Sequence, residues 1–175
     1  DFYSPGLLDK CKDNIIILNG FSKAFAMTGW RLGVAIGPKN IIAKMNLMLN
    51  TIVSCVPPFI QYAGIEALEG DQRAILEMRD KYRDRRDIFI RGLNSVKGIS
   101  CNLPKGAMYA FFNITGTGLT SDQFARKSLH EAGVALLPGN CFGVHGEGYA
   151  RVTFANSSVN IRMGIKRLQS TFGIK

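Results

Sequence analysis

A long amphipathic stretch near the middle of the chain constrains the fold more than any other feature. Apolar residues recur there at steps of three, four and seven: Ile75, Met78, Tyr82, Phe89, Leu93 and Val96. This spacing places them on one face of an α-helix. We therefore expect a single helix over residues 71–96, long enough to act as a spine that joins two lobes.

The chain has a formal net charge of +9, and many of its charged residues lie on the same predicted helix. Its basic and acidic residues are interleaved: Arg79, Lys81, Arg83, Arg85, Arg86 and Arg91 with Glu77, Asp80, Asp84 and Asp87. Mixed charges at helical spacing indicate a solvated face with ion pairs between residues i and i+4. We favour this interpretation over a nucleic-acid-binding stripe and predict no nucleic-acid partner.

Two short β-branched runs before the long helix predict buried strands, at residues 14–19 and 32–37. Helical patterns follow from residue 40 to the break at residues 56–58, and again over residues 59–70. After residue 97 the elements become shorter. We expect strand-like segments at residues 99–103, 108–114, 134–137 and 149–155, a helix over residues 121–132 capped by Thr120, and a final helix capped by Asn156 and Ser157. The fold class is therefore α/β.

The composition excludes several classes of protein. No apolar stretch reaches the roughly 18 residues of a membrane span, and the first residues lack the features of a signal peptide, so we expect a cytoplasmic protein with no membrane partner. The four cysteines contain no Cys-x-x-Cys pair, and His130 and His145 are far apart. We therefore predict no metal site.

Lys23 is the candidate catalytic residue. It follows the hydroxyl residue Ser22 and lies among apolar neighbours, Phe21, Ala24, Phe25, Ala26 and Met27. Desolvation of its ammonium would favour the neutral amine, which attacks carbonyl carbons. The arrangement suits a lysine that carries a phosphorylated aldehyde cofactor, although composition alone also allows an ordinary solvated lysine.

Two arginines are candidate anion-binding residues. Arg31 follows Gly29 in a turn, and with Ser22 it would hold the phosphate group of the cofactor. The alternative for Arg31 is a structural pair with a carboxylate. Arg151 shares one face of a predicted strand with Thr153, and its anion is either a local carboxylate or the carboxylate of a substrate.

Residues 19–33, NGFSKAFAMTGWRLG, closely resemble the cofactor-lysine signature of class I aminotransferases, which are pyridoxal-phosphate enzymes of fold type I. The resemblance continues through five further segments: residues 54–58, 61–68, 104–109, 133–143 and 148–157. Several motifs in the same order are far more specific than one pattern. The resemblance covers nearly the whole chain, but it corresponds only to the C-terminal portion of the family.

The resemblance implies a role for each candidate residue. Lys23 would form a Schiff base with pyridoxal 5'-phosphate and move the proton of the substrate. Ser22 and Arg31 would bind the cofactor phosphate, and Arg151 would pair bidentately with the α-carboxylate of the substrate. The implied reaction transfers an amino group from an amino acid to a 2-oxo acid, in a homodimer.

The resemblance also implies a domain organisation. Residues 1–56 would be the C-terminal part of a large cofactor-binding domain with a mixed, mostly parallel sheet. Residues 57–97 would form a linking helical region, and residues 98–175 a small α/β C-terminal domain. Because the stacking and acidic residues around the cofactor ring would lie upstream, we expect this chain alone to bind cofactor weakly and to be inactive.

Two alternatives remain open at this point. The lysine signature reports the cofactor and not the reaction, so a lyase or synthase of the same fold type is one. The other is a non-catalytic structural or dimerising fragment that has kept the motifs.

Overall fold

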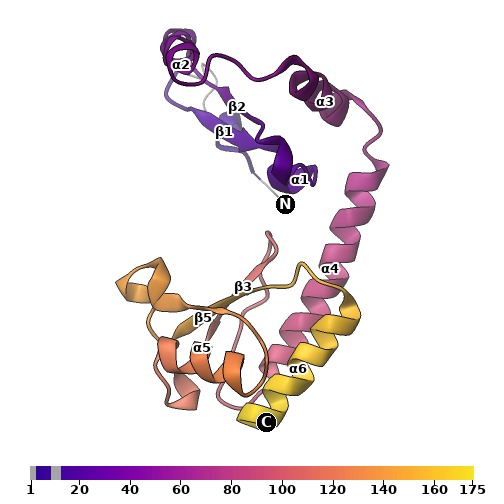
Figure 1. Cartoon of the computed structure of the whole chain (residues 1–175), viewed down its shortest axis with the longest axis vertical. Helices are drawn as coiled ribbons and strands as arrows, with labels where there is room; N and C mark the ends of the chain where they lie inside the picture. Colours follow the sequence, from indigo (N-terminus) through magenta and orange to yellow (C-terminus); the bar gives the residue numbers. More distant parts are fainter. Residues whose placement is uncertain (1–2, 9–12) are drawn as a thin grey trace. The chain divides into compact units, whose positions relative to one another are not determined.

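The chain forms two compact units, Asp1–Leu76 and Glu77–Lys175 (Figure 1). The computed structural model describes residues 3–8 and 13–175. The boundary between the units lies within the long helix α4 (Arg73–Asn94). The expected division at residues 56 and 97 stays a prediction.

The first unit is built around a two-stranded sheet in which β1 (Ile17–Gly20) pairs with β2 (Gly33–Ile36). The pairing is antiparallel and places Ile17 opposite Ile36 and Gly20 opposite Gly33. The other elements are η1 (Pro5–Leu7), α1 (Phe21–Ala24), η2 (Thr28–Trp30), α2 (Lys39–Ile52) and α3 (Pro58–Glu69). The structure confirms the strands and both helices that the sequence predicts before α4, with bounds that differ by a few residues.

The expected mixed, mostly parallel sheet is not found. Every strand pair among the described residues is antiparallel, in both units. A parallel pair needs a long crossover connection, usually a helix that packs on the sheet. The connection from β1 to β2 instead consists of α1 and η2 and returns the chain beside the strand it has just left. Strand periodicity predicts a strand but not the direction of its partner.

The expectation that both strands of the first unit are buried is also wrong for this chain. Leu18 on β1 is 72% exposed and Ile36 on β2 is 55% exposed. Among residues 3–8 and 13–76, only Phe21, Met27 and Gly64 are buried. A two-stranded sheet has too little surface to build layers on both of its faces. The apolar character of these strands therefore reflects neighbours that the described residues do not supply.

Helix α4 matches the predicted long helix closely, and Phe89 and Leu93 of its apolar stripe are buried. Its charged face differs in detail from the prediction. Asp80 pairs with Arg79 at 3.1 Å and with Arg83 at 3.2 Å, and Arg86 pairs with Asp87 at 2.8 Å. Along the described α4, the ion pairs thus join residues one or three positions apart and not four. Exposed pairs of this kind add little stability.

The second unit contains a three-stranded antiparallel sheet in the order β3-β5-β4. Its elements after α4 are β3 (Tyr109–Asn113), η3 (Thr115–Thr117), α5 (Ser121–His130), β4 (Leu137–Pro138), η4 (Gly139–Phe142), η5 (Val144–Gly146), β5 (Tyr149–Thr153) and α6 (Ser158–Phe172). Expected strands at residues 99–103 and 134–137 shrink to a bridge between Ser100 and Asn113 and to the two-residue β4.

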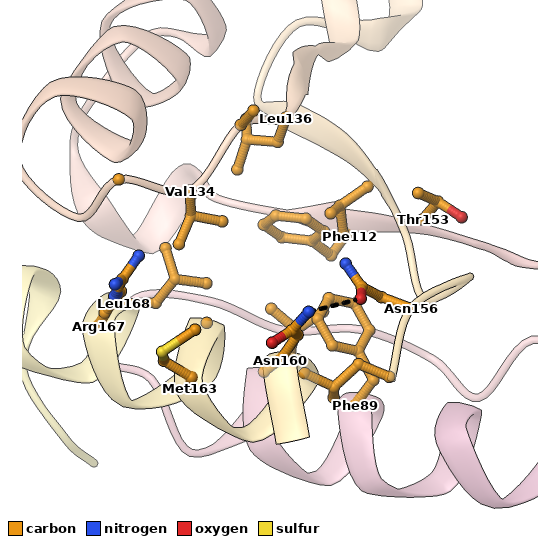
Figure 2. A pocket seen from close by; sticks show the side chains of 16 residues that line it. Phe89, Phe112, Val134, Leu136, Thr153, Asn156, Asn160, Met163, Arg167 and Leu168 are labelled. Carbon is orange, nitrogen blue, oxygen red and sulfur yellow. Dashed lines mark hydrogen bonds between the residues drawn. The ribbon is translucent and has the colours of Figure 1, made fainter. Parts of the chain in front are cut away.

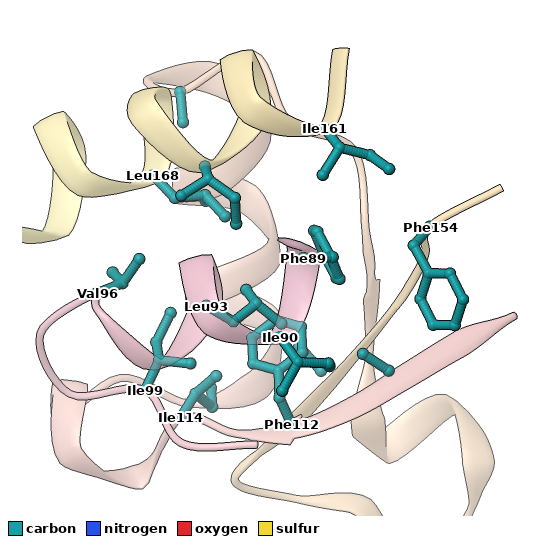
Figure 3. Packing of buried hydrophobic residues seen from close by; sticks show 14 of the residues in the cluster. Phe89, Ile90, Leu93, Val96, Ile99, Phe112, Ile114, Phe154, Ile161 and Leu168 are labelled. Carbon is teal, nitrogen blue, oxygen red and sulfur yellow. The ribbon is translucent and has the colours of Figure 1, made fainter. Parts of the chain in front are cut away.

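One face of this sheet and three helices enclose a continuous apolar core (Figure 3). Phe89 and Leu93 of α4 pack with Phe112 of β3, Phe124 of α5 and Leu168 of α6. Figure 1 shows α4 and α6 side by side in this unit. Since Ala110, Phe112 and Ala150 point into the core, the residues that alternate with them lie on the opposite face of the sheet.

Both predicted helix caps of the second unit are confirmed. Thr120 Oγ1 accepts a hydrogen bond from Gln123 N at 3.3 Å, and Thr120 N donates to Gln123 Oε1 at 3.0 Å, which completes a capping box. Ser157 Oγ accepts a hydrogen bond from Asn160 N at 3.1 Å at the start of α6.

A membrane-crossing helix would have to be longer and more apolar than any helix in the described part of the chain.

Candidate cofactor and substrate site

The connection between β1 and β2 brings Ser22, Lys23 and Arg31 together. Gly20 and Gly33 form the last pair of the strand register, and Phe21 N donates to Leu32 O at 3.1 Å, which extends the pairing by one step. Ser22 and Arg31 are the next residues on the two arms. The two arms of this connection thus carry a serine and an arginine, and Lys23 follows Ser22 on α1.

Apolar packing holds this loop in place, but it does not bury Lys23. Phe21 and Met27 are buried, and the Phe21 and Phe25 rings stack with centroids 5.1 Å apart. Lys23 itself is exposed. Successive residues of a helical turn point about 100° apart, so Phe21 faces inward while the Lys23 side chain faces outward. The described residues therefore do not provide the desolvation that the sequence predicts.

Arg31 has an unusual backbone conformation. It is left-handed, with φ 52° and ψ 39°, and Ala26 near the other end of the loop has φ 53°. A non-glycine residue in this region costs about 1–2 kcal/mol, and such residues gather at ligand-binding sites. The strained loop is a structural sign of function that the sequence motif alone did not reveal.

The Arg31 guanidinium retains most of its hydrogen-bonding capacity. Its Nη1 donates to Thr28 O at 2.9 Å, and within the described residues it forms no ion pair. The predicted alternative, a structural pair with a carboxylate, is therefore not found there. The remaining N–H groups are available for an external anion. A hydroxyl, an amine and a free guanidinium on one loop fit a phosphorylated aldehyde.

Arg151 lies in the middle of β5, opposite Phe111 of β3. The predicted alternation is confirmed, because Ala150 and Phe154 are buried while Arg151 lies on the other face of the sheet and is half-buried. The described part of the chain offers Arg151 no ion pair. Of the two anions considered for it, the local carboxylate is not observed.

Two aromatic rings contact the Arg151 guanidinium. Its Cζ atom is 4.7 Å from the centre of the Tyr109 ring and 4.2 Å from the centre of the Phe142 ring. Neither ring is identified from the sequence alone as a neighbour of Arg151. Alternation along β3 places Tyr109 on the same face as Arg151, which is a usable signal. Phe142 lies in a glycine-rich loop, where periodicity carries no information.

The candidate residues fall into two groups. Ser22, Lys23 and Arg31 belong to the first unit, and Arg151 belongs to the second. The structure brings the first three together on one loop, and it describes Arg151 within its own unit.

The second unit contains a cavity of about 390 Å³ (Figure 2), and Arg151 is not among the residues that line it. It is lined by core residues such as Phe89, Phe112 and Leu168, and at its edge Asn160 Nδ2 donates to Asn156 Oδ1 at 2.9 Å. Phe112 and Val152 line it from the core face of the sheet, whereas Arg151 is on the opposite face. We therefore do not assign this cavity to the substrate.

Comparison with known proteins gives a consistent result. A family model described as aminotransferase class I and II matches residues 1–168. The aspartate aminotransferase of Pyrococcus horikoshii is 41% identical over 159 residues, which are 90% of this chain and 41% of that protein. Aromatic-amino-acid aminotransferase 2 of Thermococcus litoralis is 39% identical over 169 residues, covering 95% of this chain and 43% of that protein.

Solved structures agree with these relatives. The crystal structure of an aromatic aminotransferase from Pyrococcus horikoshii matches with a TM-score of 0.91 and 42% identity, over 97% of this chain and 46% of that chain. An aspartate aminotransferase from Rhizobium meliloti matches with a TM-score of 0.91 and 32% identity, over 97% of this chain and 45% of that chain. The chain thus spans less than half the length of these relatives. It has the α/β fold of this part of an aminotransferase, and it belongs to the class I and II aminotransferases, a family of pyridoxal-phosphate-dependent transferases.

Proposed function

We propose that the full-length protein containing this chain is an aminotransferase that transfers an amino group from an amino acid to a 2-oxo acid. The observation that carries the proposal is the short connection between β1 and β2, which carries Ser22, Lys23 and Arg31. Family membership supports it, since the relatives are named as aminotransferases acting on several kinds of amino acid.

Lys23 would hold the cofactor and handle the proton of the reaction. When bound, pyridoxal phosphate supplies an aldehyde carbon for the amine and a ring that withdraws electrons from the α-carbon of the substrate. The Lys23 Nζ atom must be neutral for either task, because only its lone pair can bond to a carbonyl carbon or accept a proton from the α-carbon.

Ser22 and Arg31 would hold the phosphate. The Ser22 hydroxyl donates one hydrogen bond, and the planar Arg31 guanidinium offers two parallel N–H groups to the phosphate oxygens. The hydrogen bond from Arg31 Nη1 to Thr28 O orients this fork without using a charge. The left-handed backbone at Arg31 is then a cost offset by a fixed direction of the side chain.

Arg151 would bind the α-carboxylate that amino acids and 2-oxo acids share. A bidentate pair fixes the orientation of the carboxylate, and with it the direction of the bond from the α-carbon to its proton. Lysine at this position would keep the charge but lose the orientation.

We further propose that these 175 residues alone bind the cofactor weakly and transfer little or no amino group. The exposure of Lys23 and of the strands beside it supports this, because the described residues do not enclose the place where the cofactor would bind. A homodimeric full-length protein is proposed as well, supported by exposed apolar residues of the first unit such as Leu18 and Phe59. A cytoplasmic location stays a prediction from the sequence.

The test is a turnover assay of the full-length protein with pyridoxal phosphate and a panel of donors that includes aspartate, alanine and phenylalanine. We expect 2-oxo acid formation to stop after about one equivalent per site when no acceptor is present, and to continue when a 2-oxo acid acceptor is added. Continued turnover without an acceptor would indicate a lyase or synthase. A protein that neither binds the cofactor nor turns over any donor would indicate a structural fragment.

A further inference from the structure

We propose that Tyr109 and Phe142 are positioning residues for Arg151, and that their rings hold the plane of its guanidinium so that its N–H edge faces a substrate carboxylate. This inference rests on the proposed function, since it assigns Arg151 the carboxylate shared by amino acids and 2-oxo acids. It adds two residues to the substrate site that act through Arg151.

The contacts are specific to the charged end of the side chain. The guanidinium carbon, and not only the aliphatic part, lies 4.7 Å from the Tyr109 ring centre and 4.2 Å from the Phe142 ring centre. Both distances are well inside the roughly 6 Å limit for a cation over an aromatic face. Tyr109 and Arg151 are half-buried and Phe142 is 47% exposed, so the group is open to a ligand on one side.

The chemistry explains why rings suit this task better than a carboxylate would. The five N–H donors of a guanidinium lie in its plane, whereas a ring that stacks on it occupies its face. Ring contacts therefore restrain the orientation of Arg151 and leave both the donors and the positive charge for an incoming anion. A structural ion pair would use the same donors that the substrate needs, and the described residues form none with Arg151.

Further aromatic contacts brace the Phe142 ring. Phe111, which lies opposite Arg151 in the strand register, meets the Phe142 ring edge-on with centroids 5.9 Å apart and an interplanar angle of 88°. Phe111 also stacks on the Tyr149 ring, with ring centroids 5.2 Å apart and an interplanar angle of 4°. The outer face of the sheet is thus a connected aromatic surface around one cation.

The loop that carries Phe142 is fixed by backbone packing. A Cβ atom added to Gly139 would come within 2.6 Å of Tyr149 O and closer still to Gly146 O, so η4 and η5 pack backbone against backbone. Asn140 Nδ2 donates to Asp122 Oδ2 at 2.9 Å and ties the same loop to α5. Phe142 therefore reaches Arg151 from a well-defined position.

The test uses calorimetry to compare how tightly the full-length protein binds two probes that contain no amine. The first is 3-phenylpropanoate, which carries a carboxylate, and the second is 3-phenylpropanamide, which has the same shape without the charge. We expect Tyr109→Leu and Phe142→Leu each to raise the Kd of the carboxylate by about 2- to 30-fold, the range of cation–π contacts. Binding of the amide should be unchanged, and Tyr109→Phe and Phe142→Tyr should bind the carboxylate as the unmodified protein does.

Kinetics give an independent readout. KM should rise by a similar factor for every amino donor and oxo-acid acceptor, with a smaller change in kcat, because the carboxylate is common to all of them. If a leucine variant does not fold, Phe142 can be replaced by pentafluorophenylalanine, which keeps the ring but reverses the sign of the partial charge on its face. This variant should weaken binding of the carboxylate probe and leave binding of the amide unchanged.

Arg151→Lys separates this inference from the proposed function. If Arg151→Lys weakens binding of the carboxylate probe but the ring variants do not, the positioning role of the rings is overturned and the proposed function stands. Equal losses for carboxylate and amide would also overturn it, since the rings would then be only apolar surface. If Arg151→Lys leaves the carboxylate unaffected, the substrate-binding role proposed for Arg151 fails, and the positioning role fails with it.

Discussion

Two glycines inside helices of the second unit should respond differently to replacement by alanine: one variant should be more stable and the other should not. Gly92 lies in α4, where an added Cβ would come 2.7 Å from Ile165 Cγ1 and 2.8 Å from Ile165 Cγ2. Gly164 lies in the neighbouring helix α6, where an added Cβ would meet no heavy atom within 4 Å. The pair is a matched experiment, since both sites are helical and only one is crowded.

The expected magnitudes follow from these distances. Alanine in place of glycine stabilises a helix interior by about 0.8–1 kcal/mol, and Gly164→Ala should show this gain in full. At Gly92 the clash falls on the stiff, buried β-branched part of Ile165, so the two helices must separate. Overpacking of this kind costs about 1–3 kcal/mol, so Gly92→Ala should be neutral or destabilising by up to about 2 kcal/mol.

Urea unfolding of the chain, followed by circular dichroism, would measure both changes. The Ile165→Ala background provides the decisive control, because it removes the atoms that cause the clash. There Gly92→Ala should stabilise as Gly164→Ala does, which gives a coupling energy between positions 92 and 165 of about 1–3 kcal/mol. If Gly92→Ala stabilises the unmodified chain as much as Gly164→Ala does, the close packing of α4 on α6 is refuted.

Two further predictions concern the cysteines and the phosphate site. Burial raises the pKa of the Cys101 thiol, so Cys101 should react with thiol reagents more slowly than the exposed Cys55 and Cys141. The raised pKa also contributes to the free energy of unfolding. This contribution is complete below the unfolded-state pKa of about 8.5 and should decline as pH rises through the folded-state pKa. Cys101→Ala should remove that part of the pH dependence of unfolding, and an unchanged pH profile would contradict the assignment. Arg31→Lys in the full-length protein should weaken binding of pyridoxal phosphate by about 10- to 100-fold, because lysine keeps the charge but loses the fork. An absorbance titration that gives the same Kd for both proteins would count against a phosphate role for Arg31.

The parts of the fold that depend on local sequence could be predicted. The apolar stripe of α4 and the caps at Thr120 and Ser157 follow from neighbouring residues, and the structure matches them. The burial and partners of β1 and β2 could not be predicted in the same way. A β-branched run indicates a strand that prefers a buried place, but the layers that bury it come from elsewhere in the fold.

In the candidate site, too, features set by neighbouring residues could be predicted and features set by distant parts of the fold could not. The segment that contains Ser22, Lys23 and Arg31 is recognisable from its sequence, because the three residues lie on one short connection. The Tyr109 and Phe142 rings at Arg151 come from a strand and a distant loop, and only the antiparallel sheet with its packed glycine loop brings them together. The strain at Arg31 is also a property of the backbone that no residue pattern states.

The most direct test of the account is to identify the lysine that bonds to the cofactor. The full-length protein would be incubated with pyridoxal phosphate, reduced with borohydride, digested and mapped by mass spectrometry. We predict a single cofactor adduct on Lys23, which the Lys23→Ala variant lacks. An adduct on a different lysine, with Lys23 unmodified, would contradict the assignment of the catalytic residue and the function built on it.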